Sequence, residues 1–228
     1  MLMMGGDGVY FEHSDIKLYY EKTGTGAPLI LLHGNGEDHE IFLEAIEILK
    51  EHFTVFALDS RGHGKSSAVS ELHYSDMAED VYHFILENQI EQPVIYGFSD
   101  GGIVALLLCI RHPELIQRAI VSGVNVHPRG IKGGWLALFG MIYFFTKSPA
   151  YALMLHEPDI SKQDLASITV PVDVIGGSRD MISRRHMQAV AAAIPGGSFT
   201  ELKNETHGSY VVHSEKIAHI ILKKMKKQ

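Results

Sequence analysis

The segment PVIYGFSDGGIVA, residues 93–105, combines a β-branched strand, a sharp glycine turn and the start of a small-residue helix. Ser99 lies at the apex of this turn, in a Gly-x-Ser-x-Gly pattern. Gly97 and Gly101 leave room for the close backbone approach that such a turn requires. The turn projects the serine hydroxyl out of the sheet and puts the Asp100 backbone N–H at a helix N-terminus, where it can stabilise a developing oxyanion. The segment therefore predicts an activated serine rather than a plain glycine-rich turn.

A serine is a weak nucleophile without a base, and the base needs an acid to orient it. After a strand–serine–helix turn, the acid and the base are expected downstream, in that order. Asp180 follows the buried-type strand predicted at residues 172–176, where a carboxylate can reach across the carboxyl edge of the sheet. Asp173 is the competing acid, but it lies inside the strand pattern, which favours a structural role.

The base must be chosen by context, because the chain has 14 histidines. His207 lies in a loop after the short alternating strand predicted at residues 198–202, and a glycine follows it. His213 and His219 fall inside an amphipathic helix predicted over residues 211–227, where a packed or solvated histidine is typical. We therefore predict that His207 is the base.

A second oxyanion donor is expected in the turn after an earlier central strand. The strand predicted at residues 29–33 ends in His33-Gly34-Asn35, which makes the Asn35 backbone N–H the partner of the Asp100 N–H. His33 is interpreted as a loop-packing residue.

These residues occur in motifs whose order resembles that of the α/β-hydrolase superfamily of serine hydrolases. The matching motifs are HGNG at 33–36, LDSRGHGKS at 58–66, the Ser99 turn, GSRD at 177–180 and HG at 207–208. The resemblance implies Ser99 as nucleophile, Asp180 as acid and His207 as base, with Asn35 and Asp100 as oxyanion donors.

Predicted strands and helices alternate along most of the chain, which indicates an α/β fold with a mostly parallel sheet and helices on both faces. We assign residues 1–125 and 167–228 to an α/β-hydrolase core. Residues 126–166 break the alternation and are too apolar for a surface loop. In the family this position carries a cap over the active site, so a small helical cap insert is predicted there.

Trp135, Phe139 and Tyr143 recur in the insert at helical spacing, so one helix face can carry all three. As a lid, this face would bind the acyl part of a substrate. The alternative is an ordinary core helix with its aromatic residues packed on the sheet.

A formal net charge of −7 argues against a nucleic-acid partner, which needs a basic face. The sequence shows no basic, apolar leader and no run of 18 apolar residues, so a cytoplasmic protein without a membrane partner is expected. Contact of the apolar insert with a membrane surface remains open.

The single cysteine cannot form an internal disulfide, and the histidines lack a zinc-binding spacing, so no metal or other cofactor is expected.

Ser99 favours acyl transfer to water, because relatives that open epoxides or remove halides use an aspartate at that position. The favoured hypothesis is a carboxylesterase-type hydrolase acting on a small-molecule ester with a small or medium acyl group. One alternative is the same triad cleaving a carbon–carbon bond, a thioester or a lactone, or performing perhydrolysis. Another is a slow-turnover ligand receptor. The sequence leaves the substrate and the oligomeric state open.

Overall fold

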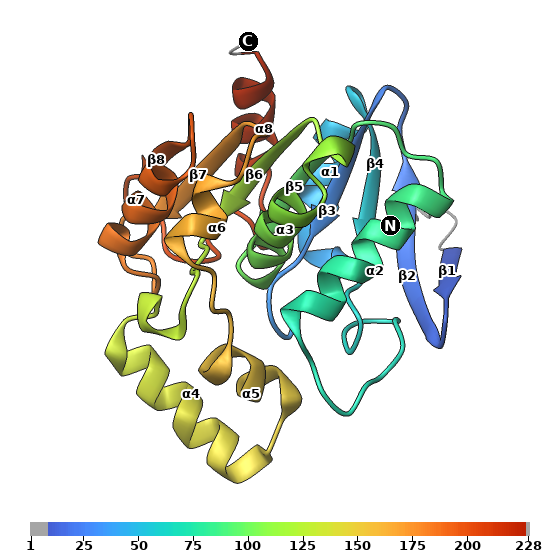
Figure 1. Ribbon diagram of the computed structural model, residues 1–228. Coiled ribbons are helices and arrows are strands. Elements are labelled where there is room, and N and C mark those ends of the chain that lie inside the picture. Colours follow the sequence, from blue (N-terminus) through green and yellow to red (C-terminus); the bar gives the residue numbers. More distant parts are fainter. Residues whose placement is uncertain (1–8, 227–228) are drawn as a thin grey trace.

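The computed structural model describes residues 9–226. Within that range eight strands form one sheet in the order β1-β2-β4-β3-β5-β6-β7-β8 (Figure 1). β1 and β2 form an antiparallel hairpin and β2 is antiparallel to β4, whereas β3 to β8 run parallel. The strands are β1 (Val9–His13), β2 (Ile16–Thr23), β3 (Ala27–Leu32), β4 (Phe53–Leu58), β5 (Val94–Phe98), β6 (Arg118–Ser122), β7 (Val172–Gly177) and β8 (Ser198–Leu202). The mostly parallel sheet confirms the predicted fold class.

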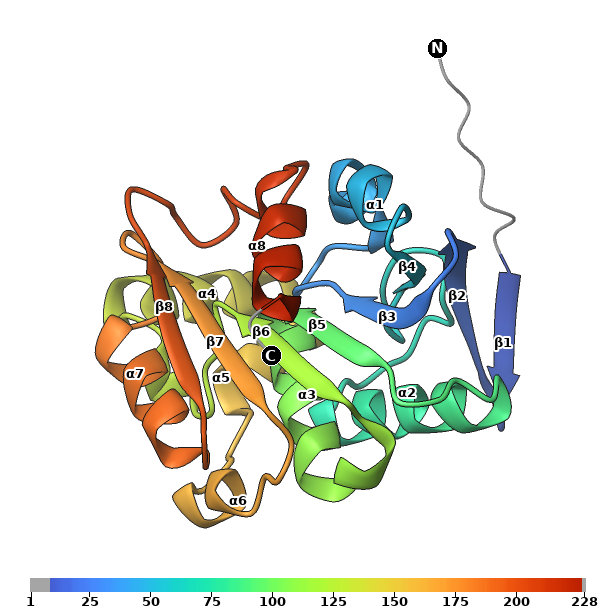
Figure 2. The ribbon, with the colours of Figure 1, turned by 90° about the horizontal axis from the view of Figure 1, so that it is seen from above.

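Helices cover both faces of the sheet, as Figure 2 shows from above. On one face, α1 (Leu43–Leu49) and α8 (Lys216–Met225) enclose a core with β3, β4 and β5. The other face carries α2 (Tyr74–Glu87), α3 (Asp100–Arg111) and α7 (Arg184–Ala193). Because both faces are covered, the central strands are apolar along their length, and every residue from Leu29 to Leu32 is at most 1% exposed.

The insert predicted at residues 126–166 holds three α-helices: α4 (Gly133–Thr146), α5 (Pro149–His156) and α6 (Lys162–Ala166). α6 packs against α7 and α3, and its Leu165 is buried in the core between them. α4 and α5 pack on each other at the lower left of Figure 1, and Phe139 of α4 and Leu153 and Met154 of α5 are buried against the core. The part of the insert that corresponds to the predicted cap is therefore α4 and α5.

The closing helix is shorter than the one predicted over residues 211–227. α8 begins at Lys216, because the turn after His207 continues first: the Val211 and Val212 N–H groups both donate to the Gly208 carbonyl. His213, predicted to be helical, lies in this turn with φ +47°. Residue 227 lies outside the described range. No helix between residues 9 and 226 has both the length and the apolar character needed to cross a bilayer.

Candidate active site

Ser99 occupies the turn between β5 and α3 with φ 53° and ψ −113°, a backbone conformation that a non-glycine residue adopts only under constraint. The Ser99 N–H donates to the Ser122 carbonyl at 2.8 Å, which fixes the turn to β6. A side chain on Gly97 would overlap the backbone of Gly101, and one on Gly101 would overlap the backbone of Leu32. The two glycines are therefore required by the closeness of the backbone around Ser99.

The structure brings together the three residues predicted to form a triad. His207 Nε2 lies 3.1 Å from Ser99 Oγ, and His207 Nδ1 lies 2.7 Å from Asp180 Oδ1. A carboxylate can only accept, so the proton of neutral His207 belongs on Nδ1, which leaves Nε2 free to accept from the serine hydroxyl. This is the tautomer that a general base for Ser99 needs.

The Asp180 carboxylate is held rigidly, with 1% of the residue exposed. Oδ1 also accepts a hydrogen bond from the Ile182 N–H at 2.8 Å, and Oδ2 accepts one from the Gly177 N–H at 3.4 Å. The competing carboxylate, Asp173, lies in β7 and contacts Lys224 Nζ at 2.8 Å and Arg118 at 3.5 Å. Its contacts tie α8 to the sheet, in agreement with the structural role expected from the sequence.

Gly123 also shapes the site, although the sequence analysis did not select it. It follows β6 with φ +61°, and a Cβ there would lie 2.6 Å from His207 Cε1. A residue with a side chain would therefore displace the imidazole from its place between Asp180 and Ser99.

The predicted oxyanion residues lie on two loops that meet beside Ser99. Asn35 follows β3 and Asp100 begins α3, and the loops are joined by a 3.0 Å hydrogen bond from the Gly101 N–H to the His33 carbonyl. Within residues 9–226, the backbone N–H groups of Asn35 and Asp100 donate to no protein acceptor. Both are thus available to a substrate oxygen, and their assignment as oxyanion donors stays a prediction.

The side chains of the same two residues form a contact that the sequence did not reveal. Asn35 Nδ2 donates to Asp100 Oδ2 at 2.8 Å and to the Ala150 carbonyl of α5 at 3.0 Å. The Tyr74 hydroxyl donates to Asp100 Oδ1 at 2.8 Å. Burial raises the pKa of the Asp100 carboxyl, and the bonds from Asn35 and Tyr74 oppose that rise. No local pattern marks these contacts, because the partners come from four distant segments.

Glu37 is a second residue that the sequence analysis missed. It lines the cavity beside Ser99, and its Oε2 accepts a hydrogen bond from the Gly34 N–H at 3.1 Å. Burial raises the pKa of this carboxyl to about 7, although the Gly34 N–H and nearby His207 favour the charged form. The HGNGE segment contained Glu37, but only the fold reveals its burial.

The cavity at Ser99 has a volume of about 200 Å³ and is lined by Gly34, Asn35, Glu37, Phe98, Ser99, Phe139, Tyr151, Met154, Met181 and His207. Of the three predicted acyl-binding residues, only Phe139 is among them. Trp135 is 47% exposed, and Tyr143 lines a neighbouring hollow of about 400 Å³ between α4, α5 and residues 70–73. Residues four apart on a helix lie about 6 Å apart along its axis, so Trp135 and Tyr143 lie about one turn to either side of Phe139 on α4.

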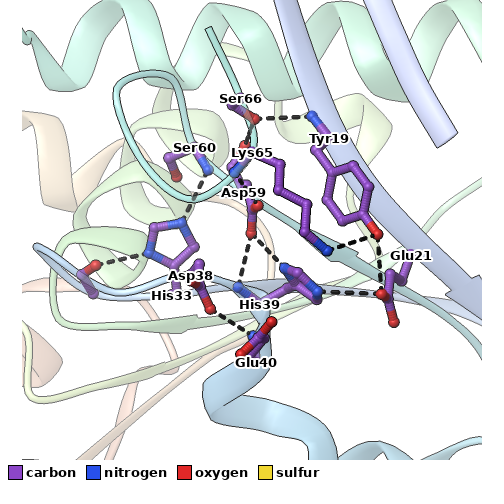
Figure 3. Close-up of polar contacts among 11 residues, drawn as sticks. Tyr19, Glu21, His33, Asp38, His39, Glu40, Asp59, Ser60, Lys65 and Ser66 are labelled. Atoms are coloured by element: carbon purple, nitrogen blue, oxygen red, sulfur yellow. Dashed lines mark hydrogen bonds and ion pairs between the residues drawn. The ribbon is translucent and has the colours of Figure 1, made fainter. Parts of the chain in front are cut away.

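The loop after β4 braces this side of the site (Figure 3). Asp59 is fully buried and accepts hydrogen bonds from the His39 N–H and Nδ1 and from the Lys65 N–H, at 2.7 to 2.8 Å. Burial acts to raise the pKa of Asp59, but these hydrogen bonds outweigh it and hold the pKa below its usual value. His33 donates from Nδ1 to the Gly34 carbonyl and accepts at Nε2 from the Ser60 N–H, so it packs one loop against the other as expected.

Two clusters in the described residues place three possible metal ligands within 4.8 Å of one another. One is Asp38, His39 and Asp59, whose atoms are engaged in the loop-bracing bonds. The other is His13, His83 and Glu87, on β1 and α2. Neither cluster includes a residue that lines the Ser99 cavity.

The fold and the arrangement around Ser99 define a hydrolase of α/β type. Sequence comparison identifies the same class: the family described as alpha/beta hydrolase fold matches residues 27–143, just over half of the chain. The chain belongs to the alpha/beta-hydrolase fold family.

Relatives with curated descriptions match part of the chain. It is 31% identical over 147 residues to the AB hydrolase superfamily protein YisY of Bacillus subtilis, which covers 64% of this chain and 49% of that protein. It is 29% identical over 103 residues to the pimeloyl-[acyl-carrier protein] methyl ester esterase of Vibrio vulnificus, covering 45% and 39% of the two chains. The matches span less than half the length of these relatives.

Solved structures match nearly the whole chain. The enol-lactonase of Burkholderia xenovorans LB400 superposes with a TM-score of 0.80 at 19% identity, covering 96% of this chain and all of that one. At this identity the likeness shows the shared fold.

Proposed function

We propose that the protein is a serine hydrolase that cleaves small carboxylic esters through a covalent acyl-enzyme. The observation that carries the proposal is the chain of contacts from Asp180 through His207 to Ser99, at 2.7 and 3.1 Å. A buried acid, an oriented imidazole and a strained serine turn are the parts that nucleophilic acyl transfer needs.

In this mechanism Ser99 Oγ attacks the ester carbonyl carbon while His207 Nε2 takes the hydroxyl proton. Asp180 stabilises the imidazolium, and the Asn35 and Asp100 backbone N–H groups donate to the oxyanion. When the tetrahedral intermediate collapses, the alkoxide leaves with the proton from His207. Water then attacks the acyl-enzyme with His207 as base again, which releases the acid and restores Ser99.

The size of the cavity supports small acyl groups. Its volume of about 200 Å³ lies below the range of roughly 300–1,000 Å³ that is usual for ligand pockets. Phe139, Tyr151 and Met154 give it an apolar wall suited to an aliphatic chain.

The test is a series of p-nitrophenyl esters from acetate to decanoate, together with labelling by a fluorophosphonate. We expect hydrolysis that is fastest for short acyl chains, a phosphonate adduct on Ser99 by mass spectrometry, and loss of both in Ser99→Ala. The matched control is Ser70→Ala, an exposed serine outside the cavity. An adduct on another residue, or full esterase activity in Ser99→Ala, rules the proposal out.

A further inference from the structure

α4 has the composition of a buried helix but the exposure of a surface helix. Its 14 residues, GGWLALFGMIYFFT, include no charged side chain, and only Phe139 is buried. The exposed large side chains are Trp135, Leu138, Met141, Phe144 and Phe145, which are 47%, 42%, 61%, 67% and 77% exposed. A helix that is apolar all round is normally enclosed by other structure, and an exposed apolar patch of this kind marks an interaction surface.

The length of α4 restricts what can enclose it. A helix of 14 residues is about 21 Å long, whereas a bilayer span needs about 20 residues. One side of α4 is also occupied, since Phe139 packs against Tyr151 of α5 with ring centroids 5.9 Å apart. The helix can therefore lie on an apolar surface but cannot cross a bilayer.

The charges around α4 indicate the chemistry of that surface. Residues 126–156 contain no Asp or Glu, in a chain whose net charge is −7; of their basic residues, Arg129 and Lys147 are exposed, whereas Lys132 Nζ donates to the Asp180 carbonyl. Lys147 lies just beyond the end of α4, with its Nζ 5.3 Å from the Tyr143 ring centroid and 5.1 Å from that of Phe144. A basic rim around an apolar, aromatic face complements an anionic lipid surface, where aromatic rings enter the interface and lysines reach the headgroups.

The same charges oppose a second copy of the chain as the occupant. If two α4 helices packed face to face, the basic rim formed by the exposed Arg129 and Lys147 would meet the same two residues of the second copy. Residues 126–156 supply no acidic residue to neutralise it, and Glu71 and Glu157, which line the hollow that Lys147 also lines, lie outside this segment. Self-association through this face would bring like charges together, whereas a membrane rich in anionic lipid would neutralise them.

We infer that the exposed face of α4 is a docking surface for an anionic lipid membrane, on which the cap rests with Leu138, Met141 and Phe145 at the centre of the face and Trp135 and Phe144 at its two edges. This inference replaces the expectation that the protein has no membrane partner. It does not depend on the proposed ester hydrolysis, because binding is measured without turnover.

The chain offers a direct probe, because Trp135 is its only tryptophan and lies exposed at the edge of this face. The protein is titrated with vesicles of phosphatidylcholine alone and of phosphatidylcholine with phosphatidylglycerol, and Trp135 emission and co-sedimentation are followed. We expect a blue shift and sedimentation with the anionic vesicles that weaken as salt is raised, and much weaker binding to the neutral vesicles. Ser99→Ala should bind equally well, which separates this test from the fate of the proposed reaction.

Two pairs of variants test the two parts of the surface. Phe144→Ser/Phe145→Ser removes apolar contact, and the matched control is Leu86→Ser, at an exposed leucine of α2. Arg129→Glu/Lys147→Glu reverses the rim, and the control is Lys223→Glu on α8, at the opposite end of the molecule from α4 (Figure 1). Each basic residue near an anionic surface strengthens binding about fivefold, so the rim variant should bind at least about 25-fold more weakly.

Circular dichroism checks that each variant is folded. The inference is overturned if anionic vesicles leave Trp135 emission unchanged, or if the α4 variants bind as well as their controls. It is also overturned if ultracentrifugation without lipid shows a dimer that Phe144→Ser/Phe145→Ser dissolves, because the occupant would then be a second copy.

Discussion

The Asn35 side-chain amide donates to the Asp100 carboxylate at 2.8 Å, which ties the loop after β3 to the first residue of α3. These are the two residues whose backbone N–H groups are predicted to hold the oxyanion. The same amide reaches the Ala150 carbonyl of α5 at 3.0 Å, so the position of the cap is linked to the spacing of the two donors. A preorganised oxyanion site depends on such bracing, because its donors must not move when charge develops.

Asn35→Ala should therefore lower kcat by about tenfold and leave KM nearly unchanged, since the backbone donor stays but its loop is no longer fixed. This loss is smaller than the roughly 10²–10³ that follows complete removal of an oxyanion donor. Steady-state kinetics on the best p-nitrophenyl ester measure both constants. Asn88→Ala, which removes a hydrogen bond to Phe84 at the end of α2, is the control. An effect confined to KM would show that Asn35 binds substrate instead of bracing the loop.

Asp180→Asn should reduce kcat on the order of 10⁴-fold with the fold intact, because an amide at this position favours the wrong tautomer of His207. Asp173→Asn is the matched control, in β7, the strand that leads to Asp180. It weakens the contacts with Lys224 and Arg118, so we expect about 2 kcal/mol of lost stability and less than a tenfold change in rate. Kinetics and urea unfolding of both variants give the comparison, and the reverse ranking of rates would identify Asp173 as the orienting acid.

The sequence predicts those parts of the site whose residues lie within one short, contiguous segment. The Ser99 turn can be recognised in the sequence because the strand, the glycines and the helix are contiguous in residues 93–105. Asp180 and His207 are found because each follows a strand whose pattern is clear, and parallel strands end at one edge of the sheet. The structure then brings both to Ser99.

The parts that the sequence does not predict depend on contacts between distant segments. Nothing near Tyr74 indicates that its hydroxyl meets Asp100, 26 residues away. The burial of Glu37 is likewise a property of the assembled loops. In α4 the apolar residues surround the helix, so periodicity cannot tell which side faces Ser99, and only Phe139 reaches the cavity.

Glu37 should make stability depend on pH in a direction opposite to that of a salt-bridged carboxylate. Burial raises the pKa of Glu37 to about 7 from 4.5. Because the unfolded chain loses this proton at lower pH than the folded protein, stability should fall as pH rises from about 4.5 to 7, by about 2 kcal/mol after allowance for screening by solvent. Urea unfolding of the wild type and Glu37→Gln across this range measures the slope.

Glu37→Gln should remove this part of the pH dependence. The stability of this variant relative to the wild type should therefore be greater at pH 7 than at pH 5. Glu40→Gln, at an exposed glutamate three residues away, controls for loss of charge in the same segment. If wild type and Glu37→Gln lose stability in parallel between pH 4.5 and 7, the buried carboxyl is not the cause.

Phe139→Ala should change the acyl-chain preference and also destabilise the protein. Phe139 lines the Ser99 cavity, is 8% exposed and packs against Tyr151 and Trp135, with ring centroids 5.9 and 6.2 Å apart. Truncation enlarges the cavity, so the optimum among p-nitrophenyl esters should move to longer chains, with a stability loss of about 3 kcal/mol. Tyr143→Ala is the matched control on the same helix, because Tyr143 lines the neighbouring hollow and should leave the optimum unchanged. Melting temperature and chain-length profile, measured together on both variants, separate the two effects. A large loss of stability in Phe139→Ala with an unchanged profile would mean that α4 supports the cap without contacting the acyl group.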